Sequence, residues 1–419
     1  NYAYRDNKIV NWCDNDQTVL ANEQVIDGKC WRCDTNVTNK EVTQWFLNIA
    51  SYSQVLLDDL KLLPFWPNAV KKMQQNWIGR SKGNEVIFNL TETLGKINKI
   101  SVFTSRLETI YGVTFVAVSF EHPILKFLDA NIKKEITKFS LKTDKKNIFG
   151  TFTGKYAIHP INKLKIPIWA ASYVLSNYGQ GAVMGVPAHD IRDWQFAEKY
   201  KIMHISVIET EQTLPYCKQV DSDTVKNSEL INGCNLIDAR YIIAKKLSKL
   251  GITREVICYR LQDWSVSRQR FWGAPIPILY DRDGGIHGEK IENLPIMLED
   301  IYPEKFSNAE PRKPENYIRE KDTFDTFMES SWYYLRFCDP KNEKNICSSV
   351  NSNYWLPVDL YIGGIEHACM HLLYARYMHK VLRELNLVTC KEPFDRLLTQ
   401  GMVVNNAYYF YDAANKKIW

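Results

Sequence analysis

The spacing of apolar positions separates the chain into stretches of different periodicity. Between Glu41 and Gln75 apolar side chains recur every three or four residues until Pro64 and Pro67 interrupt them, which predicts a helical region. The apolar positions of this pattern are Trp45, Phe46, Ile49, Tyr52, Leu56, Leu57 and Leu60. The first 46 residues instead hold cysteines among polar, turn-forming residues, which indicates a separate small module.

The amino-acid composition changes after Arg80, where short runs of β-branched and aromatic residues appear. Such runs predict strands and lie at 86–88, 100–103, 115–118, 166–169 and 181–186. A charged stretch from Ile124 to Lys142 and a Lys-rich one at 242–250 predict helices between and after these strands. The mixture predicts an α/β domain over residues 81–255.

Beyond Cys258 glycine and proline punctuate the chain, and a turn is expected at 283–285. A predicted strand at 358–362 runs through Gly363 and Gly364 into a predicted helix from Glu366 to about Leu385. Strand, double glycine and helix are typical of half of a doubly wound nucleotide-binding sheet. One domain inserted into another would explain this order, with boundaries at 1–46, 47–80, 81–255 and 256–419.

Composition narrows the class of protein without naming a function. Hydrophobic residues make up 45% and charged residues 24%, as in ordinary globular proteins. The net charge of +5 permits a polyanionic partner but does not require one. There is no apolar run of ~20 residues and no signal-peptide pattern. Because the chain begins with Asn1, we expect a missing N-terminal part, and the ten cysteines are too sparse for a disulfide scaffold. We expect cytoplasm or an organelle matrix, a monomer, and contact with neither membrane nor DNA.

Three cysteines in the first module are spaced as metal ligands. Cys30 and Cys33 can both reach one Zn²⁺, and Cys13 precedes them by 17 residues. The fourth ligand would be water, a residue outside this chain, or one of the aspartates Asp14, Asp16 and Asp34. A zinc module and plain buried thiols both remain possible, whereas redox catalysis is disfavoured because no thioredoxin-like strand and helix surround the pair.

Two segments of the α/β domain carry groups suited to ester chemistry. A predicted strand ends in the hydroxyl-rich sequence from Thr104 to Thr109, which could bind a carbonyl and hold a water, although a helix N-cap is the simpler explanation of the hydroxyls. The segment from Tyr178 to Asp193 combines glycines, which allow close backbone approach, with two aspartates three residues apart. A lone histidine there, His189, is a possible general base but more often structural.

Together the two segments resemble the peptides that face each other in the editing domain of leucyl-tRNA synthetases. That family carries a Thr-rich peptide and a Gly-x-Gly-Ala-Val-Met…His-Asp-x-Arg-Asp peptide, both present here. The resemblance implies a pocket for a mischarged 3′-terminal adenosine formed by Thr104, Ser105, Arg106, Thr109, Met184, His189, Asp190 and Asp193. By the same resemblance, Thr109 would block leucine from a hydrolytic geometry and Asp193 would bind the α-amino group.

The Thr-rich peptide departs from the family pattern at three positions. The family usually has Thr, Pro and Asp where this chain has Ser105, Leu107 and Glu108. Serine keeps the hydroxyl, the loss of proline relaxes the loop, and the longer Glu108 reaches further. Editing is needed because an apolar pocket separates side chains differing by one methylene by only ~1–3 kcal/mol.

The C-terminal part resembles the synthetic half of the same class I family. A stretch from Asp263 to Gly273 is shared with isoleucyl and valyl enzymes, whereas the blocks at 322–334 and 361–374 match the leucyl enzymes. The resemblance implies that Phe327, Ser330 and Tyr333 shape the leucine pocket. It also implies that Gly363 and Gly364 approach adenine, Glu366 bonds the ribose, and His367 and His371 flank the leucyl-adenylate. The spacing of His367 and His371 also suits a metal, but no third ligand is evident.

Two elements of class I synthetases are absent from the sequence. Neither a His-Ile-Gly-His-like nor a Lys-Met-Ser-Lys-Ser-like element occurs. The expected parent is a leucine–tRNA ligase acting on tRNA-Leu, leucine and ATP with Mg²⁺. The chain is expected to be an internal fragment that retains only editing. The alternatives are an isoleucyl- or valyl-type relative, or a non-catalytic tRNA-binding remnant.

Overall fold

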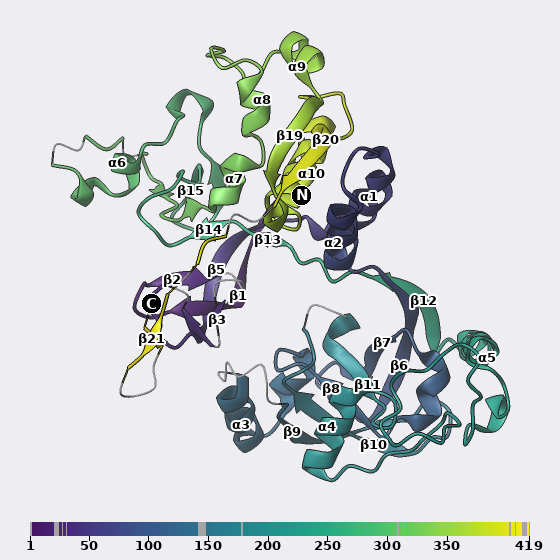
Figure 1. Ribbon diagram of the computed structural model, residues 1–419. Helices are drawn as coiled ribbons and strands as arrows, with labels where there is room; N and C mark the ends of the chain where they lie inside the picture. Colours follow the sequence, from purple (N-terminus) through teal and green to yellow (C-terminus); the bar gives the residue numbers. More distant parts are fainter. Residues whose placement is uncertain are drawn as a thin grey trace. The chain divides into compact units, whose positions relative to one another are not determined.

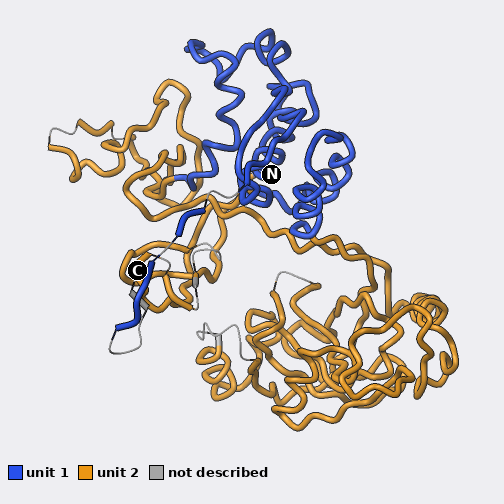
Figure 2. The backbone as a smooth tube through the Cα atoms, viewed as in Figure 1, with its two compact units in different colours: residues 1–2, 48–78, 324–419 blue, residues 3–47, 79–323 orange. Residues whose placement is uncertain are grey.

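The computed structural model describes residues 2–20, 25–26, 28–30, 32–140, 148–176, 179–307, 310–312, 314–401, 404–406, 408–412 and 417–418. Strands and helices are mixed along these residues (Figure 1), which confirms the predicted α/β class. They form two compact units (Figure 2), one of residues 1–2, 48–78 and 324–419 and the other of residues 3–47 and 79–323. Trp31, Tyr178 and the predicted helix end at Lys142 lie outside the described residues. Among the described residues, no helix is both long and apolar enough to cross a membrane.

The larger unit begins with a four-stranded sheet in the order β13-β5-β1-β2. Its strands are β1 (Ala3–Cys13), β2 (Thr18–Leu20), β5 (Thr38–Leu47) and β13 (Trp264–Ser265). A two-stranded hairpin of β3 (Val25–Ile26) and β4 (Lys29–Cys30) lies between β2 and β5 in the sequence. The helical periodicity predicted from Glu41 was therefore wrong up to Leu47, because pairing along the whole of β1 holds these residues in a strand.

The centre of the larger unit is a seven-stranded sheet in the order β11-β8-β10-β9-β6-β12, with β7 paired to β6. Its strands are β6 (Ser81–Leu94), β7 (Ile97–Thr104), β8 (Phe115–Val118), β9 (Gly150–Ile158), β10 (Lys165–Ala171), β11 (Ala182–Gly185) and β12 (Thr253–Cys258). Its helices are α3 (Ala130–Ser140), α4 (Ile191–Tyr200) and α5 (Leu236–Lys249). Each predicted strand coincides with a strand of this sheet, whereas the helix expected from Ile124 begins only at Ala130, after a 3-10 turn at Pro123–Phe127. Strands β9 and β12 and helix α4 were not predicted.

The buried strand β8 shows how helices cover both faces of this sheet. Phe115 and Ala117 pack in one apolar cluster with Phe196 of α4. Val116 and Val118 point to the other face and join the larger cluster, which includes four buried residues of α5. Complete burial of a side chain such as Phe196 stabilises the fold by about 1.5–3 kcal/mol. The edge strand β11 and the helix α4 that follows it are therefore held rigidly.

The rest of the larger unit consists of short elements. They are β14 (Ser267–Arg268), β15 (Ile278–Tyr280), β16 (Ile286–Gly288), β17 (Ile318–Arg319) and α6 (Leu298–Ile301), followed at the unit boundary by β18 (Thr323–Phe324). The turn expected at 283–285 joins β15 to β16, with Gly284 at a φ of +83° that glycine adopts readily.

The smaller unit contains a parallel strand pair joined by a helix. Strand β19 (Val358–Gly364) pairs in parallel with β20 (Phe394–Gln400), and α10 (His371–Glu384) connects them. The other elements are α1 (Ser53–Asp58), α2 (Asn68–Ile78), α7 (Thr326–Ser330), α8 (Tyr333–Phe337), α9 (Ser349–Trp355), β21 (Phe410–Tyr411) and β22 (Lys417–Ile418). This β-α-β unit has the strand, glycine pair and helix that the sequence predicted.

Two helices of this unit begin or end differently from the prediction. The helix expected from Glu366 starts only at His371, because a 3-10 turn at Ile365–His367 comes first and Met370 has a non-helical backbone. The three-residue spacing of Phe327, Ser330 and Tyr333 in the sequence predicts one helical face, but the structure divides these residues between α7 and α8. Trp332, at φ −135°, lies at this break and turns the chain.

Candidate functional site

The hydroxyl-rich segment leaves β7 at its last residue and folds into a tight loop. Thr104 is buried at the strand end, and its hydroxyl accepts a 3.0 Å hydrogen bond from the Arg106 backbone N–H. Thr109 is also buried, and its hydroxyl donates to the Arg106 carbonyl at 2.8 Å. Ser105 is exposed at the turn between them. Hydrogen bonds within the loop therefore hold the two threonines, whereas Ser105 faces solvent.

The side chain of Arg106 is held by a carboxylate that the sequence did not place in the site. Nε of Arg106 lies 2.7 Å from Glu108, whose side chain has no exposed surface. Arg240 of α5 donates two further bonds to the same carboxylate at 2.8 and 2.9 Å. Nη2 of Arg106 is buried without a hydrogen-bond partner in the described part of the chain, so a donor is available for a ligand oxygen.

The second segment supplies β11 and the first turn of α4. Asp190 is the N-cap of α4, and its side chain accepts hydrogen bonds from the backbone N–H groups of Arg192 and Asp193. Burial tends to raise the pKa of Asp190, but hydrogen bonds from Arg192 outweigh it and lower that pKa. Met184 is buried on β11. Asp190, one of the predicted pocket residues, therefore also fixes the start of the helix that carries Asp193.

Asp193 is the most deeply buried acidic group of this segment, with only 5% of its surface exposed. Tyr173 donates to one carboxylate oxygen at 2.7 Å and the Val186 N–H to the other at 2.8 Å. Burial and the nearby charge of Asp190 raise the pKa of Asp193 to about 7, although both hydrogen bonds act in the opposite direction. Such a carboxylate is suited to a cationic ligand, because an ammonium group would favour its charged form.

The geometry around His189 favours the structural role over the general base. Its Nε2 accepts a 3.0 Å hydrogen bond from the Val207 N–H, and its Nδ1 lies 3.3 Å from the Tyr216 carbonyl. Burial lowers the pKa of His189, which keeps the ring neutral. Both ring nitrogens are therefore engaged by backbone groups, and neither is free to take a proton from water.

The two segments lie close together in the folded domain. Strand β7, which ends at Thr104, lies against β11 as well as pairing with β6. The glycine Gly179 lies against Phe103, where a Cβ would come within 2.7 Å of that side chain. A positive charge at Arg106 contributes to lowering the pKa of His189. The loop of Thr104–Thr109 and the segment of Met184–Asp193 thus border one region of the domain.

A surface hollow of about 280 Å³ on the same domain lies elsewhere. It is lined by Ile87, Asn89, Lys99, Ile158, Pro160, Lys163, Leu250, Gly251 and Ile252, none of which belongs to either segment. The hollow offers lysines but no carboxylate or hydroxyl loop for ester chemistry. We therefore place the candidate site at the polar groups of the two segments and not at this hollow.

In the smaller unit, aromatic residues and histidines of the two predicted blocks meet at the end of β19. Phe327 lies 6.2 Å from His367 and 5.7 Å from Tyr374, measured between ring centres. The hydroxyl groups of Tyr333 and Tyr361 form a hydrogen bond of 2.8 Å. The Ser330 hydroxyl donates to the Phe327 carbonyl at 3.2 Å, and so it is used within α7.

Tyr361 links the two blocks and was not among the predicted site residues. Its hydroxyl lies 2.6 Å from Nε2 of His371, and its ring stacks on Phe394 at 3.9 Å. Burial, assisted by His367, lowers the pKa of His371 to about 4, so this ring is neutral near pH 7. Nδ1 of both histidines is buried without a partner in the described residues, which leaves two polar atoms for a ligand. The position of Tyr361 two residues before the glycine pair was the signal available in the sequence.

The glycine pair closes the strand as the sequence predicted. A Cβ at Gly364 would come within 2.1 Å of the Glu366 carboxylate, so the exposed side chain of Glu366 folds over this glycine. A Cβ at Gly363 would meet open space. The Glu366 carboxylate can approach the Gly364 backbone this closely only because Gly364 has no side chain.

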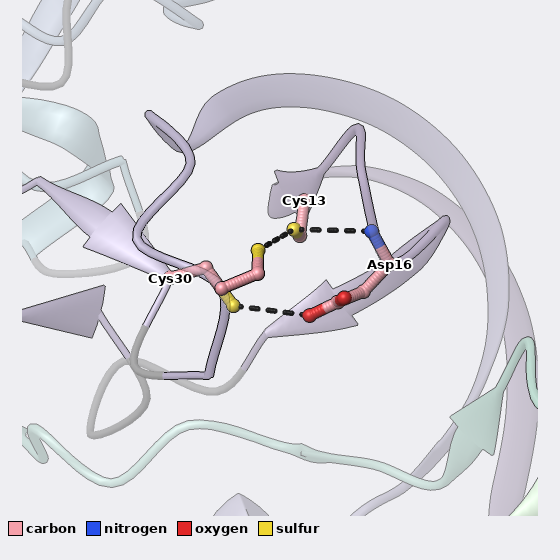
Figure 3. Close-up of side chains that lie close together, drawn as sticks. Cys13, Asp16 and Cys30 are labelled. Carbon is pink, nitrogen blue, oxygen red and sulfur yellow. Dashed lines mark hydrogen bonds between the residues drawn. The ribbon is translucent and has the colours of Figure 1, made fainter.

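The cysteines of the first module form a cluster with one aspartate. Figure 3 shows Cys13, Cys30 and Asp16 close together. Donor atoms of these residues and of Cys33 all lie within 4.8 Å of one another. The sulfur atoms of Cys13 and Cys33 are 3.4 Å apart, and the Cys30 thiol lies 3.2 Å from Asp16. This bond from Cys30 is the main cause of the lowered pKa of Asp16. Ligands around a tetrahedral Zn²⁺ are separated by about 3.8 Å, so the four donors fit that ion in number, type and spacing.

Two family models match consecutive parts of the chain. A family model described as "Leucyl-tRNA synthetase, editing domain" matches residues 75–248, and one described as "tRNA synthetases class I (I, L, M and V)" matches residues 250–407. Leucine–tRNA ligases of Haemophilus influenzae and Pasteurella multocida are each 45% identical to the chain over its whole length. The chain spans about half of these relatives, 51% of each.

A solved structure shows the same fold. The chain is similar to the agnB2 LeuRS of Agrobacterium radiobacter K84, solved as a ternary complex with tRNA and LeuAMS, with a TM-score of 0.80 and 37% identity. The match covers 96% of this chain and 50% of that one. The resemblance inferred from the sequence motifs is thereby confirmed. The chain belongs to the leucyl-tRNA synthetase family and contains its editing domain and class I catalytic-domain sequence.

Proposed function

We propose that this chain is part of a leucine–tRNA ligase and that it hydrolyses aminoacyl esters mischarged onto tRNA-Leu. The observation that carries the proposal is the buried carboxylate of Asp193 on the segment that borders the Thr104–Thr109 loop. A carboxylate suits the substrate ammonium, and hydroxyl and guanidinium groups suit the ester and the terminal nucleotide. The proposed pocket consists of Thr104, Ser105, Arg106, Thr109, Met184, His189, Asp190 and Asp193.

Hydrolysis at this site needs an oriented water rather than a covalent nucleophile. Water attacks the ester carbonyl, the bond from this carbon to the ribose oxygen breaks, and the free amino acid and the ribose hydroxyl leave. Asp193 fixes the ammonium end and Arg106 offers its open Nη2 to an oxygen of the terminal nucleotide. Since the Thr109 hydroxyl already donates within the loop, a steric role suits Thr109 better than water activation.

The proposal is tested by deacylation of tRNA-Leu charged with isoleucine or norvaline. We expect the purified 419-residue chain to release the amino acid faster than buffer, and Asp193→Asn to lose this activity with the fold intact by circular dichroism. A folded wild-type chain that binds the tRNA yet releases no amino acid would instead identify a tRNA-binding remnant.

Replacement of Thr109 by alanine should remove the discrimination against leucine. Without the γ-methyl and hydroxyl groups, leucine can take up the hydrolytic geometry, so deacylation of Leu-tRNA-Leu should rise about tenfold or more. Thr137→Ala is a matched control, because the Thr137 hydroxyl also donates to a backbone carbonyl but lies on the exposed helix α3. Leu-tRNA-Leu that stays intact with Thr109→Ala contradicts the steric role.

The smaller unit supports a proposal for the synthetic reaction of the whole protein. Phe327, Ser330 and Tyr333 would shape the leucine pocket, and the partners would be leucine, tRNA-Leu and ATP with Mg²⁺. Gly363, Gly364, Glu366, His367 and His371 would receive the adenylate. The two unpartnered Nδ1 atoms of the histidines support this assignment, because a polar ligand would satisfy them. We propose that editing is the only reaction of the two that this chain performs alone, since the phosphate-binding elements of the class do not occur in its sequence.

The cysteine cluster is proposed as a structural zinc site with Asp16 as the fourth ligand. Zinc would hold the loops of the first module together. Burial raises the pKa of the Cys13 thiol to about 11, so a cation is needed to favour its thiolate at neutral pH.

We expect about one equivalent of zinc in the purified chain and a large loss of it with Cys30→Ser or Asp16→Asn. Zinc released on thiol modification can be measured with a colorimetric chelator. Cys217→Ser serves as the control, because Cys217 is an exposed free cysteine outside the cluster. A chain that neither carries zinc nor binds it on titration contradicts the proposal.

A further inference from the structure

The carboxylate of Asp193 is oriented by a tyrosine from a separate part of the domain. Tyr173 lies in the turn after β10, which ends at Ala171, and its hydroxyl donates to Oδ1 of Asp193 at 2.7 Å. The Val186 N–H holds Oδ2 from the end of β11 at 2.8 Å. Because each oxygen has a donor on a different element, the plane of the carboxylate is fixed.

The ring that carries this hydroxyl is itself fixed by packing. Tyr173 packs against Phe196 of α4 with ring centres 5.7 Å apart. The guanidinium of Arg192, on the same helix, lies 6.0 Å from the centre of the tyrosine ring. Phe196 is fully buried and stacked on Phe115 of β8. The hydroxyl is therefore held in place by the same helix and sheet that position Asp193.

Several titratable groups surround Asp193. On its own helix these are Asp190, which raises the pKa of Asp193, and Arg192, which lowers it. From other segments they are Tyr173 and Cys217. Burial, and then the charges of Asp190 and Asp193, raise the pKa of the Cys217 thiol. Burial, and then the charge of Asp193, raise the pKa of Tyr173 well above its ordinary value, so the phenol stays protonated as a donor.

We infer that Tyr173 is a positioning residue of the editing site, whose hydroxyl holds Asp193 in the orientation that receives the substrate ammonium. This inference rests on the proposed editing function. The hydroxyl also favours the ionised carboxylate, because a hydrogen bond donated to an anion stabilises the anion. Without it, burial and Asp190 would leave Asp193 protonated over more of the neutral pH range. A protonated Asp193 cannot pair with an ammonium ion.

The test is the pH dependence of deacylation of isoleucyl-tRNA-Leu by the wild-type chain and by Tyr173→Phe, each corrected for spontaneous hydrolysis. The acid limb of the profile reports ionisation of Asp193, and the alkaline limb reports loss of the substrate ammonium near pH ~8. Tyr173→Phe should move the acid limb upward by about one pH unit and lower the rate about tenfold on that limb. Replacement of Tyr173 by 3-fluorotyrosine, a stronger donor with the same ring, should move the limb downward.

Tyr200→Phe is the matched control. Tyr200 lies at the other end of α4, and its hydroxyl accepts a 2.9 Å bond from the Gly150 N–H, so no carboxylate depends on it. Its acid limb should equal that of the wild type. If Tyr173→Phe or 3-fluorotyrosine leaves the acid limb in place, the positioning role is overturned, even where the rate falls uniformly. A wild-type chain that deacylates nothing overturns the proposed function itself and the inference with it.

Discussion

Replacement of Glu392 by glutamine should destabilise the smaller unit by about 3–5 kcal/mol. Glu392 is buried, and its carboxylate receives two hydrogen bonds of 2.8 Å from Arg376, which is fully buried, and one of 2.9 Å from Lys380. Arg376 also donates to Gln74, and Lys380 to Asp59. The amide would leave a buried guanidinium and a largely buried ammonium group with much less compensating negative charge, so the cost of their desolvation would be only partly offset.

The effect can be measured by hydrogen exchange of the α10 amides, which report on this unit alone. A loss of 3–5 kcal/mol corresponds to exchange faster by roughly two to four orders of magnitude. Asp395→Asn is the matched control, since it also converts a carboxylate to an amide, but in an exposed pair 3.7 Å from Arg396. That change should cost about 0–1 kcal/mol. Equal exchange rates in the two variants would show that the buried network contributes little.

The sequence predicted secondary structure well where local pattern and tertiary contacts agree. The alternation of strands through the editing domain, the hydroxyl loop after β7 and the strand–glycine–helix order of β19 and α10 were all expected. The residues from Glu41 to Leu47 were predicted wrongly, because their apolar spacing fits a helix while they pair with β1, from Ile9↔Glu41 to Ala3↔Leu47, far away in the sequence. A local pattern cannot report a partner that is distant in the sequence.

Several residues that support the sites could not be predicted from the sequence for the same reason, because their partners are distant in the sequence. Tyr173 contacts Asp193 across 20 residues and Arg240 contacts Glu108 across 132 residues, and neither tyrosine nor arginine stands out in its own segment. The histidine His189 was recognised from its motif, but only the folded structure shows both of its ring nitrogens engaged by backbone groups. Asp16 was one of three aspartates that the sequence could not separate, and the folding of β1 and β4 brings it to the cysteines. Motifs identify the chemistry of a site, whereas the supporting residues follow from topology.

Glu108 is one of the three positions at which the Thr-rich peptide departs from the family pattern, and its carboxylate contacts both Arg106 and Arg240. Its side chain has no exposed surface and lies between two arginines, whereas the side chains of Arg106 and Arg240 are 36% and 35% exposed. Glu108→Gln should therefore destabilise the editing domain by about 2–3 kcal/mol, less than a fully buried pair, because water still reaches both guanidinium groups.

The same substitution should also lower the rate of deacylation. Arg106 would lose the charge that orients it, so we expect a fall in rate of about tenfold or more at a temperature where the domain stays folded. Glu255→Gln is the control, because Glu255 forms an exposed pair with Lys82 in the same domain at 3.0 Å. Glu108→Asp distinguishes the effect of the negative charge from the effect of side-chain length, since it keeps the carboxylate on a side chain one methylene shorter. If Glu108→Asp matches the wild type in rate and stability, charge alone orients Arg106; if it matches Glu108→Gln, the bridge to Arg240 requires the full length of glutamate.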